Sequence, residues 1–175
     1  MSSVNSIPER LVDFRVYSNG STLLGVADVE LPKVQFQTAQ LKGAGILGEL
    51  ETPTVGMTKS LKTKITFRTT TSAMVSLLDC AGHSLEFRGV VQKCDASGNR
   101  GYESCRVVVR GFPSEGELGK MDKGASGNSS IELECAYLKY VISDSTVLEI
   151  DKLNYIFKVG GTDLLSTIKT ALGIV

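Results

Sequence analysis

The segment from residue 41 to residue 58, LKGAGILGELETPTVGMT, constrains the fold most, because it separates two strand-like runs and is too apolar for an ordinary surface loop. It combines four glycines with six large apolar residues: Leu41, Ile46, Leu47, Leu50, Val55 and Met57. Surface loops are usually polar, and long loops inside a compact domain are usually functional or disordered. Disordered segments contain few large apolar residues. Two interpretations remain open: an apolar segment that binds a surface outside its own domain, or an Ω-loop folded over its own core.

The length and charge of the chain limit its class. A chain of 175 residues is most simply one domain with a sizeable core, and we expect a single domain over 1–175. It contains 19 Lys and Arg and 19 Asp and Glu, so its formal net charge is zero, which argues against nucleic-acid binding through bulk charge. The sequence contains neither an apolar run of membrane-spanning length nor a signal peptide. We therefore expect synthesis and folding in the cytoplasm and no stable membrane association.

Most of the apolar pattern alternates, which predicts antiparallel strands. Asn19-Gly20 predicts a hairpin turn, and Ser97-Gly98-Asn99 predicts a second one. After the long segment, Leu61, Ile65 and Phe67 fall on one strand face and lysines on the other. A change of phase near 136–138 predicts a bulge in the long strand that begins at residue 129.

Two stretches have helical spacing instead. Thr71 or Ser72 can cap the first of them, and Thr162 is the expected cap of the second, which Gly173 would end. The apolar stripe of this C-terminal helix can bury one face, against the sandwich or against a neighbour. The sequence therefore predicts a mainly β fold: an antiparallel β-sandwich or barrel of about seven strands, with one flanking helix and a short C-terminal helix. A second long glycine-rich loop is expected over 113–128.

The sequence contains no pattern that amounts to an active site. The four cysteines lack C-x-x-C spacing and His83 is the single histidine, so we predict no metal site and no cofactor. A disulfide between Cys94 and Cys105 is conceivable only if the intervening turn is centred on Asn99-Arg100, and a reducing compartment would keep both thiols free. His83 lies at a helix-to-strand turn, where a surface or capping role is expected. We predict that the chain is not an enzyme.

Five short motifs occur along the chain: Leu31-Pro32-Lys33, Lys42-Gly43-Ala44-Gly45, Val109-Arg110-Gly111, Cys135-Ala136-Tyr137 and the run from Val147 to Asp163. In this order they resemble the major tail tube protein of contractile-tailed (myovirus-type) bacteriophages or of phage-tail-like bacteriocins. The resemblance covers nearly the whole chain, and the C-terminal run is its most specific part. It is weaker for the tube of type VI secretion, which is similar in fold.

The resemblance implies a structural subunit of a virion tail or tail-like particle, an injection system assembled in the cytoplasm of a bacterial host. Hexameric rings would stack into a hollow conduit for DNA passage or membrane perforation. The implied partners are further copies of the chain, the tail sheath protein, and baseplate and terminator proteins. In a phage, DNA would pass through the lumen non-specifically. Two strand pairs from each subunit would join across the ring into one barrel that lines the lumen.

The resemblance also suggests where each contact would lie. The segment 41–58 would reach the neighbouring ring, through Leu41, Gly43, Gly45, Ile46, Leu47, Leu50 and Met57. Because polymer must slide through the lumen, its wall should carry polar strand faces: Gln35, Gln37, Lys62, Lys64, Thr66, Arg68, Glu132 and Glu134. The polar face of the C-terminal helix would meet the sheath, through Ser166, Lys169 and Thr170.

Two competing interpretations remain. One is a monomeric β-barrel that binds a small ligand beneath the segment 41–58 as a lid. The other is an oligonucleotide-binding barrel that uses the basic strand face, although the absence of tryptophan leaves it few stacking residues.

Overall fold

The computed structural model describes residues 6–25 and 28–174 and is mainly β. The strands are β1 (Ser6–Ser18), β2 (Thr22–Leu24), β3 (Asp28–Glu30), β4 (Phe36–Leu41), β5 (Leu50–Thr58), β6 (Lys62–Phe67), β7 (His83–Asp95), β8 (Arg100–Glu117), β9 (Ser129–Ile142), β10 (Ser145–Asp151), β11 (Ile156–Val159) and β12 (Thr162–Asp163). The helices are α1 (Ser72–Ser76) and α2 (Ser166–Leu172). No helix in the described residues is long and apolar enough to span a membrane.

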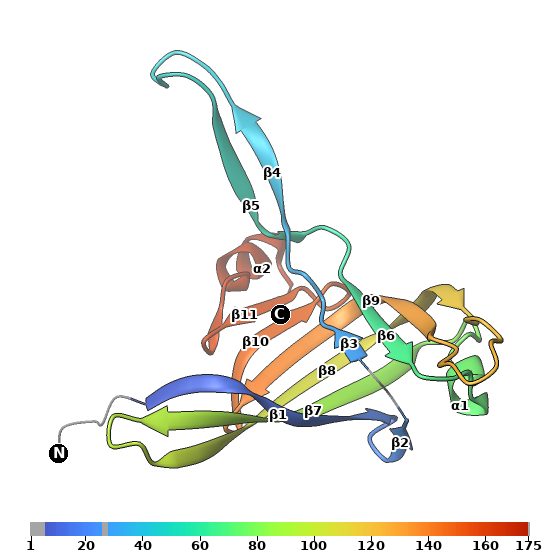
Figure 1. Cartoon of the computed structure of the whole chain (residues 1–175). Coiled ribbons are helices and arrows are strands. Elements are labelled where there is room, and N and C mark those ends of the chain that lie inside the picture. Colours follow the sequence, from blue (N-terminus) through green and yellow to red (C-terminus); the bar gives the residue numbers. More distant parts are fainter. Residues whose placement is uncertain (1–5, 26–27, 175) are drawn as a thin grey trace.

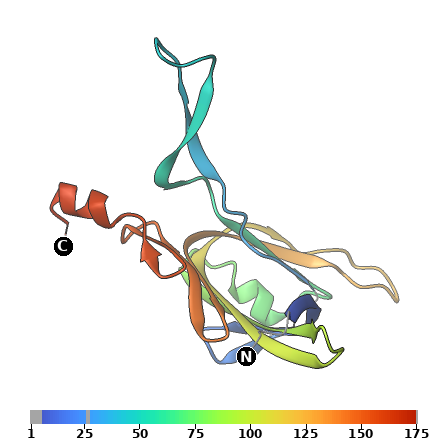
Figure 2. The same cartoon turned by 90° about the vertical axis from the view of Figure 1, so that its left-hand side faces the viewer.

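Ten strands form one antiparallel sheet, and β4 and β5 form a separate hairpin (Figure 1). The main path of the large sheet runs β12-β11-β10-β9-β8-β7-β1-β2, and β6 joins β9 and carries β3. The sheet curves around the core, while the β4–β5 hairpin and α2 project from the body (Figure 2). The predicted antiparallel β class, with one helix beside the sheet and a short C-terminal helix, is confirmed.

The core lies on the concave side of this sheet, where alternation buries one side chain in two. On β6, Ile65 and Phe67 are completely buried, while Lys62 is exposed, as the sequence pattern predicted. Helix α1 closes one end of the core: the Thr71 hydroxyl accepts a hydrogen bond from the Met74 backbone N at 3.2 Å, and Met74 is buried.

A bulge in β9 keeps the two faces of the sheet in phase. Arg110 pairs with Tyr137 and Gly111 pairs with Cys135, so Ala136 is the extra residue, at the position where the sequence predicted a bulge. A Cβ at Gly111 would lie 2.1 Å from the backbone oxygen of Glu134, so the close approach of the two strands requires glycine there.

Several boundaries differ from those that the pattern predicted. The described residues form twelve strands rather than about seven, because long extended runs are divided by turns. The run that contains Val147, for example, is a hairpin of β10 and β11. The loop expected over 113–128 is shorter, since β8 continues to Glu117. Thr162 does not cap α2: it pairs with Val159 in β12, and the helix begins only at Ser166. Gly173 ends that helix with a positive φ of 69°, as predicted.

The cysteines and the histidine have structural surroundings. Cys94 lies opposite Arg100 and Cys105 lies opposite Gly89, so the two thiols are not paired, and the four cysteines are free. Nε2 of His83 lies 2.8 Å from a carboxylate oxygen of Asp79, across the turn between α1 and β7.

Candidate assembly surfaces

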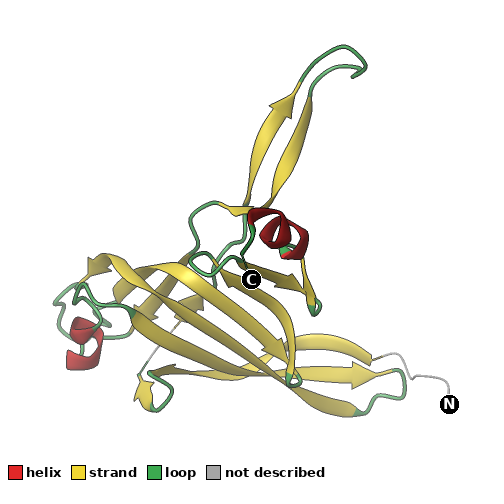
Figure 3. Cartoon of the chain, turned by 180° about the vertical axis from the view of Figure 1, so that it is seen from behind, coloured by secondary structure: helices red, strands yellow, loops and turns green. Residues whose placement is uncertain are grey.

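The segment 41–58 belongs to a projecting hairpin, which we call the arm (residues 36–58). Strand β4 pairs with β5 from Phe36 opposite Thr58 to Leu41 opposite Leu50, and residues 42–49 form its tip (Figures 1 and 3). The expectation of a long loop was therefore wrong in local structure, because residues 50–58 form a strand. The structure also excludes an Ω-loop folded over the core, since the arm points away from the body.

Apolar side chains on the arm face solvent. Leu47 at the tip is fully exposed, and Leu41, Leu50, Val55 and Met57 are each about half exposed. Of the seven residues predicted for the inter-ring contact, six lie in the distal half of the arm, and Met57 lies near its foot. The described residues thus place no core beneath the outer half of the arm, which leaves its apolar side chains available to another molecule.

Two contacts fix the foot of the arm to the body, and one hydrogen bond joins its two ends. The rings of Phe36 and Phe157 pack with centroids 5.9 Å apart. The backbone N of Lys59 donates to the carbonyl of Gln35 at 2.8 Å. Gly56, with φ of 76°, receives Leu165, and a Cβ at Gly56 would lie 2.3 Å from Cδ2 of Leu165. The arm is therefore anchored at its base, on β11 and on the segment that leads into α2.

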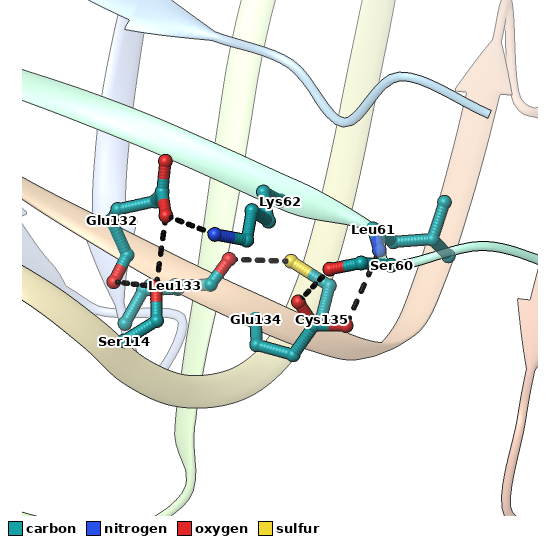
Figure 4. A network of polar contacts seen from close by, with 8 residues as sticks. All are labelled: Ser60, Leu61, Lys62, Ser114, Glu132, Leu133, Glu134 and Cys135. Carbon is teal, nitrogen blue, oxygen red and sulfur yellow. Dashed lines mark hydrogen bonds and ion pairs between the residues drawn. The ribbon is translucent and has the colours of Figure 1, made fainter. Parts of the chain in front are cut away.

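The outer face of β6 and β9 carries a network of opposite charges (Figure 4). Nζ of Lys62 lies 2.8 Å from Oε1 of Glu132, which also accepts from Ser114 Oγ at 3.1 Å. The hydrogen bond from Lys62 lowers the pKa of Glu132 and, reciprocally, raises the pKa of Lys62. Glu134 accepts from Ser60 and lies 3.7 Å from Nζ of Lys152.

The same outer face continues across β8, β7 and β1 with further charges. Arg15, Arg88 and Arg106 lie directly opposite one another on these three strands. The Glu86 carboxylate forms ion pairs with two of these arginines, 2.8 Å from Nε of Arg88 and 3.7 Å from NH1 of Arg106. The hydrogen bond from Arg88 lowers the pKa of Glu86. The Arg88 guanidinium also lies 4.4 Å from the centroid of the Tyr17 ring. We call this whole surface the polar face; it carries charges of both signs.

The structure brings six of the eight predicted lumen residues to this region and separates two. Lys62, Lys64, Thr66, Glu132 and Glu134 share the outer face of the β6–β9 pair, and Arg68 follows directly after β6. Gln35 and Gln37 lie instead at the foot of the arm, in or beside the two-stranded sheet. The sequence analysis missed the arginine row. The pattern was visible, because the charged residues of 84–92 and 104–110 mostly fall at every second position, which places them on one face of a strand: Glu86, Arg88, Arg106 and Arg110.

Helix α2 presents polar and apolar residues outside the body. The predicted sheath-facing residues Ser166 and Thr170 are exposed, whereas Lys169 is partly covered by its ion pair with Asp163, at 3.0 Å. The Leu165 backbone N–H and then Lys169 lower the pKa of Asp163. On the apolar stripe, Ile168 is 38% exposed and Leu172 is 59% exposed. Leu165 is buried against the body, so only the later part of the stripe, at Ile168 and Leu172, is not docked on its own sandwich.

A family model described as phage tail tube protein FII matches residues 8–173. The chain belongs to this family. It is 28% identical over 179 residues to the tail tube protein of Escherichia phage P2, which covers 97% of this chain and 99% of that protein. It is 27% identical over 171 residues to the major tail tube protein of Serratia phage KSP20, with 97% and 98% covered.

A solved structure shares the fold. The sheath/tube terminator of an extracellular contractile injection system, PVC, in its extended state matches with a TM-score of 0.52 and 12% identity, over 76% of this chain and 96% of that one. The predicted resemblance to contractile-tail tube proteins is thus confirmed, and the chain is a tail tube protein, a structural part of a phage tail or tail-like particle. The family assignment favours this function over the monomeric ligand-binding or oligonucleotide-binding barrel.

Proposed function

We propose that the chain forms hexameric rings, that the rings stack through the arm, and that the resulting inner tube conducts DNA in a phage or perforates a membrane in a tail-like particle. The arm is the observation that carries the proposal. An isolated two-stranded hairpin is at best marginally stable in water, and this one exposes apolar side chains along its length. A neighbouring ring that covers the arm would stabilise it and bury those side chains.

The exposed area of the subunit supports contacts on several sides. The chain exposes 11539 Å², whereas a compact monomer of 18.7 kDa exposes about 8,000 Å². The excess is on the order of 3,000 Å², and a standard interface buries about 800 Å² on each partner. This surplus corresponds to roughly three to four such faces, so the subunit has area for contacts on several sides.

Each predicted surface then has one role. The arm contacts the next ring through Leu41, Gly43, Gly45, Ile46, Leu47, Leu50 and Met57. The polar face lines the lumen, where DNA passes without specific contacts. Ser166, Lys169 and Thr170 meet the sheath, and the ends of the tube meet baseplate and terminator proteins. Assembly takes place in the cytoplasm of the bacterial host.

The double variant Ile46→Asp, Leu47→Asp tests the role of the arm. We expect it to fold, because both residues lie at the tip, and to lose tubes in negative-stain electron microscopy. The matched control is Gln37→Asp, Gln40→Asp, which adds the same charge to exposed polar positions of β4. Tubes of normal length from the tip variant would exclude the tip of the arm from the ring-to-ring contact, and equal loss in both variants would show that the apolar tip has no special role, because charge added elsewhere on the arm acts in the same way.

A further inference from the structure

An apolar groove opens at the β1 edge of the sheet. It has a volume of about 270 Å³ and is lined mainly by apolar side chains, among them Leu11, Val29, Leu31, Phe87 and Val107. Leu11 is 51% exposed and Leu31 is 47% exposed, at the mouth of the groove. Residues 6–15 of β1 pair with β7 on one side and with no described strand on the other, so the β1 side of the groove borders an open sheet edge, while its floor extends across β7 and β8 to Tyr140 on β9.

The uncovered stripe of α2 lies at the other end of the same sheet. The helix follows β12, which ends the strand order opposite to β1 and β2 (Figures 1 and 2). A helix of seven residues has little stability of its own, so its conformation depends on packing. Its anchor on the body is Leu165, and Leu164, Ile168 and Leu172 remain exposed.

The positions of the groove and of the α2 stripe indicate that another copy of the chain fills the groove. A subunit cannot fill its own groove with its own α2, because the width of the sheet separates them. A side-by-side, head-to-tail contact between copies brings the β12 edge of one beside the β1 edge of the next, and a repeated heterologous contact of this kind forms a ring when the rotation between copies closes.

We propose that Ile168 and Leu172 of α2 occupy the β1–β3 groove of the neighbouring subunit in the ring. This contact rests on the proposed ring assembly and names the surfaces that join two subunits within it. It uses part of the excess exposed area, and it leaves the opposite face of α2, with Ser166 and Thr170, free for the sheath. The helix then acts as a clasp across each subunit boundary.

Disulfide trapping tests the clasp directly. The variant Leu31→Cys, Leu172→Cys is made with Cys80→Ser and Cys105→Ala, because Cys80 is exposed and Cys105 lines the groove. Mild oxidation of its tubes should give a ladder of covalent multimers on a denaturing gel. The control pair Leu31→Cys, Thr170→Cys places the second thiol on the polar face of α2 and should stay monomeric. Monomers from the stripe pair, in tubes visible by electron microscopy, would overturn the clasp while the tube remains.

A second comparison needs no cysteine. Leu172→Asp should leave the melting temperature of the dilute subunit unchanged, because Leu172 is exposed, and should weaken association roughly tenfold or more at each contact. Thr170→Asp should assemble as the wild type does. Equal assembly of Leu172→Asp and the wild type would refute the clasp. If the wild-type chain itself forms neither rings nor tubes, the proposed function fails first.

Discussion

Gly111→Ala should destabilise the subunit strongly, because the bulge of β9 leaves no room for a methyl group. The added Cβ would lie 2.1 Å from the carbonyl oxygen of Glu134 and 3.0 Å from the Cα of Cys135. These atoms belong to the backbone of the adjacent strand, so no side-chain rotation relieves the overlap. Overpacking of a tight site costs about 1–3 kcal/mol, and a backbone neighbour places this case near the upper value. For a chain of this size, about 3 kcal/mol lowers the melting temperature by about 6–12 °C.

Gly101→Ala is the matched control. Gly101 lies on the same strand, neither glycine has a positive φ, and a Cβ at Gly101 would meet nothing within 4 Å. That substitution should be neutral or should add about 0.4–1 kcal/mol through the unfolded state. The free energy of unfolding is measured in urea at subunit concentrations below those that form tubes. Equal stabilities for the two variants would refute the argument that Gly111 is required by the close approach at the bulge.

Two further substitutions test contacts elsewhere in the chain. Gly56→Ala should displace Leu165 and loosen α2, at about 1–3 kcal/mol. Amide hydrogen exchange in 164–173 should rise in this variant and stay unchanged in Gly48→Ala, where φ is also positive but the surroundings are empty. Tyr137→Phe should remove the tyrosine that ionises near pH 12 in an ultraviolet titration, because burial and the hydrogen bond to Glu149 raise the pKa of Tyr137 to about 12. A titration curve unchanged near that pH would contradict this assignment.

Local alternation predicted the parts of the fold in which one face is buried. The pattern around Ile65 and the bulge at Ala136 follow from the two-residue period of a strand, because each inward side chain must be apolar. The strand nature of 50–58 was not readable, since Pro53 and Gly56 both argue against a strand interior. Strand β5 accommodates both residues because it belongs to a two-stranded hairpin, in which one edge of the strand has no partner strand. Thr162 was assigned as a helix cap because Thr-Asp is also typical of a helix start, whereas Gly160-Gly161, both at positive φ, form the two-residue turn that pairs Thr162 with Val159.

For the candidate surfaces too, the sequence predicted the local pattern of each strand or helix but not how the elements are placed relative to one another. The charges of β6 and β9 could be placed on one face because β6 alternates throughout and β9 alternates from Ile131 to Cys135, before its bulge at Ala136. Gln37 lies at an alternating polar position of its strand, as predicted, but that strand belongs to the separate two-stranded sheet. Alternation along one strand does not show which sheet the strand joins. The apolar spacing around Ile168 was visible in the sequence. Whether this face packs on its own sandwich or on a neighbour was not, because that depends on where β12 places the helix at the edge of the sheet.

The turn after β10 should make the stability of the subunit sensitive to acid. Asp151 is largely buried, which opposes its charge, but it accepts hydrogen bonds from Asn154 Nδ2 at 2.8 Å, from Asn154 N at 2.9 Å and from Leu153 N at 3.0 Å, and its pKa is lowered on balance. Because folding lowers this pKa, the carboxylate stabilises the fold above the ordinary pKa of Asp, about 3.9, and the contribution is lost as the pH falls through the lower folded-state value.

Asp151→Asn should therefore be less stable than the wild type at neutral pH and lose less stability on acidification, as measured by urea unfolding across this range. Asp95 offers a matched control, since its carboxylate makes the same contacts with Asn99 and Ser97 in an exposed turn. Its pKa is also lowered, by Asn99 first, but solvent screens an exposed charge, so Asp95→Asn should change the curve less. Parallel curves for the wild type and Asp151→Asn would show that the buried turn does not hold its carboxylate in the charged form.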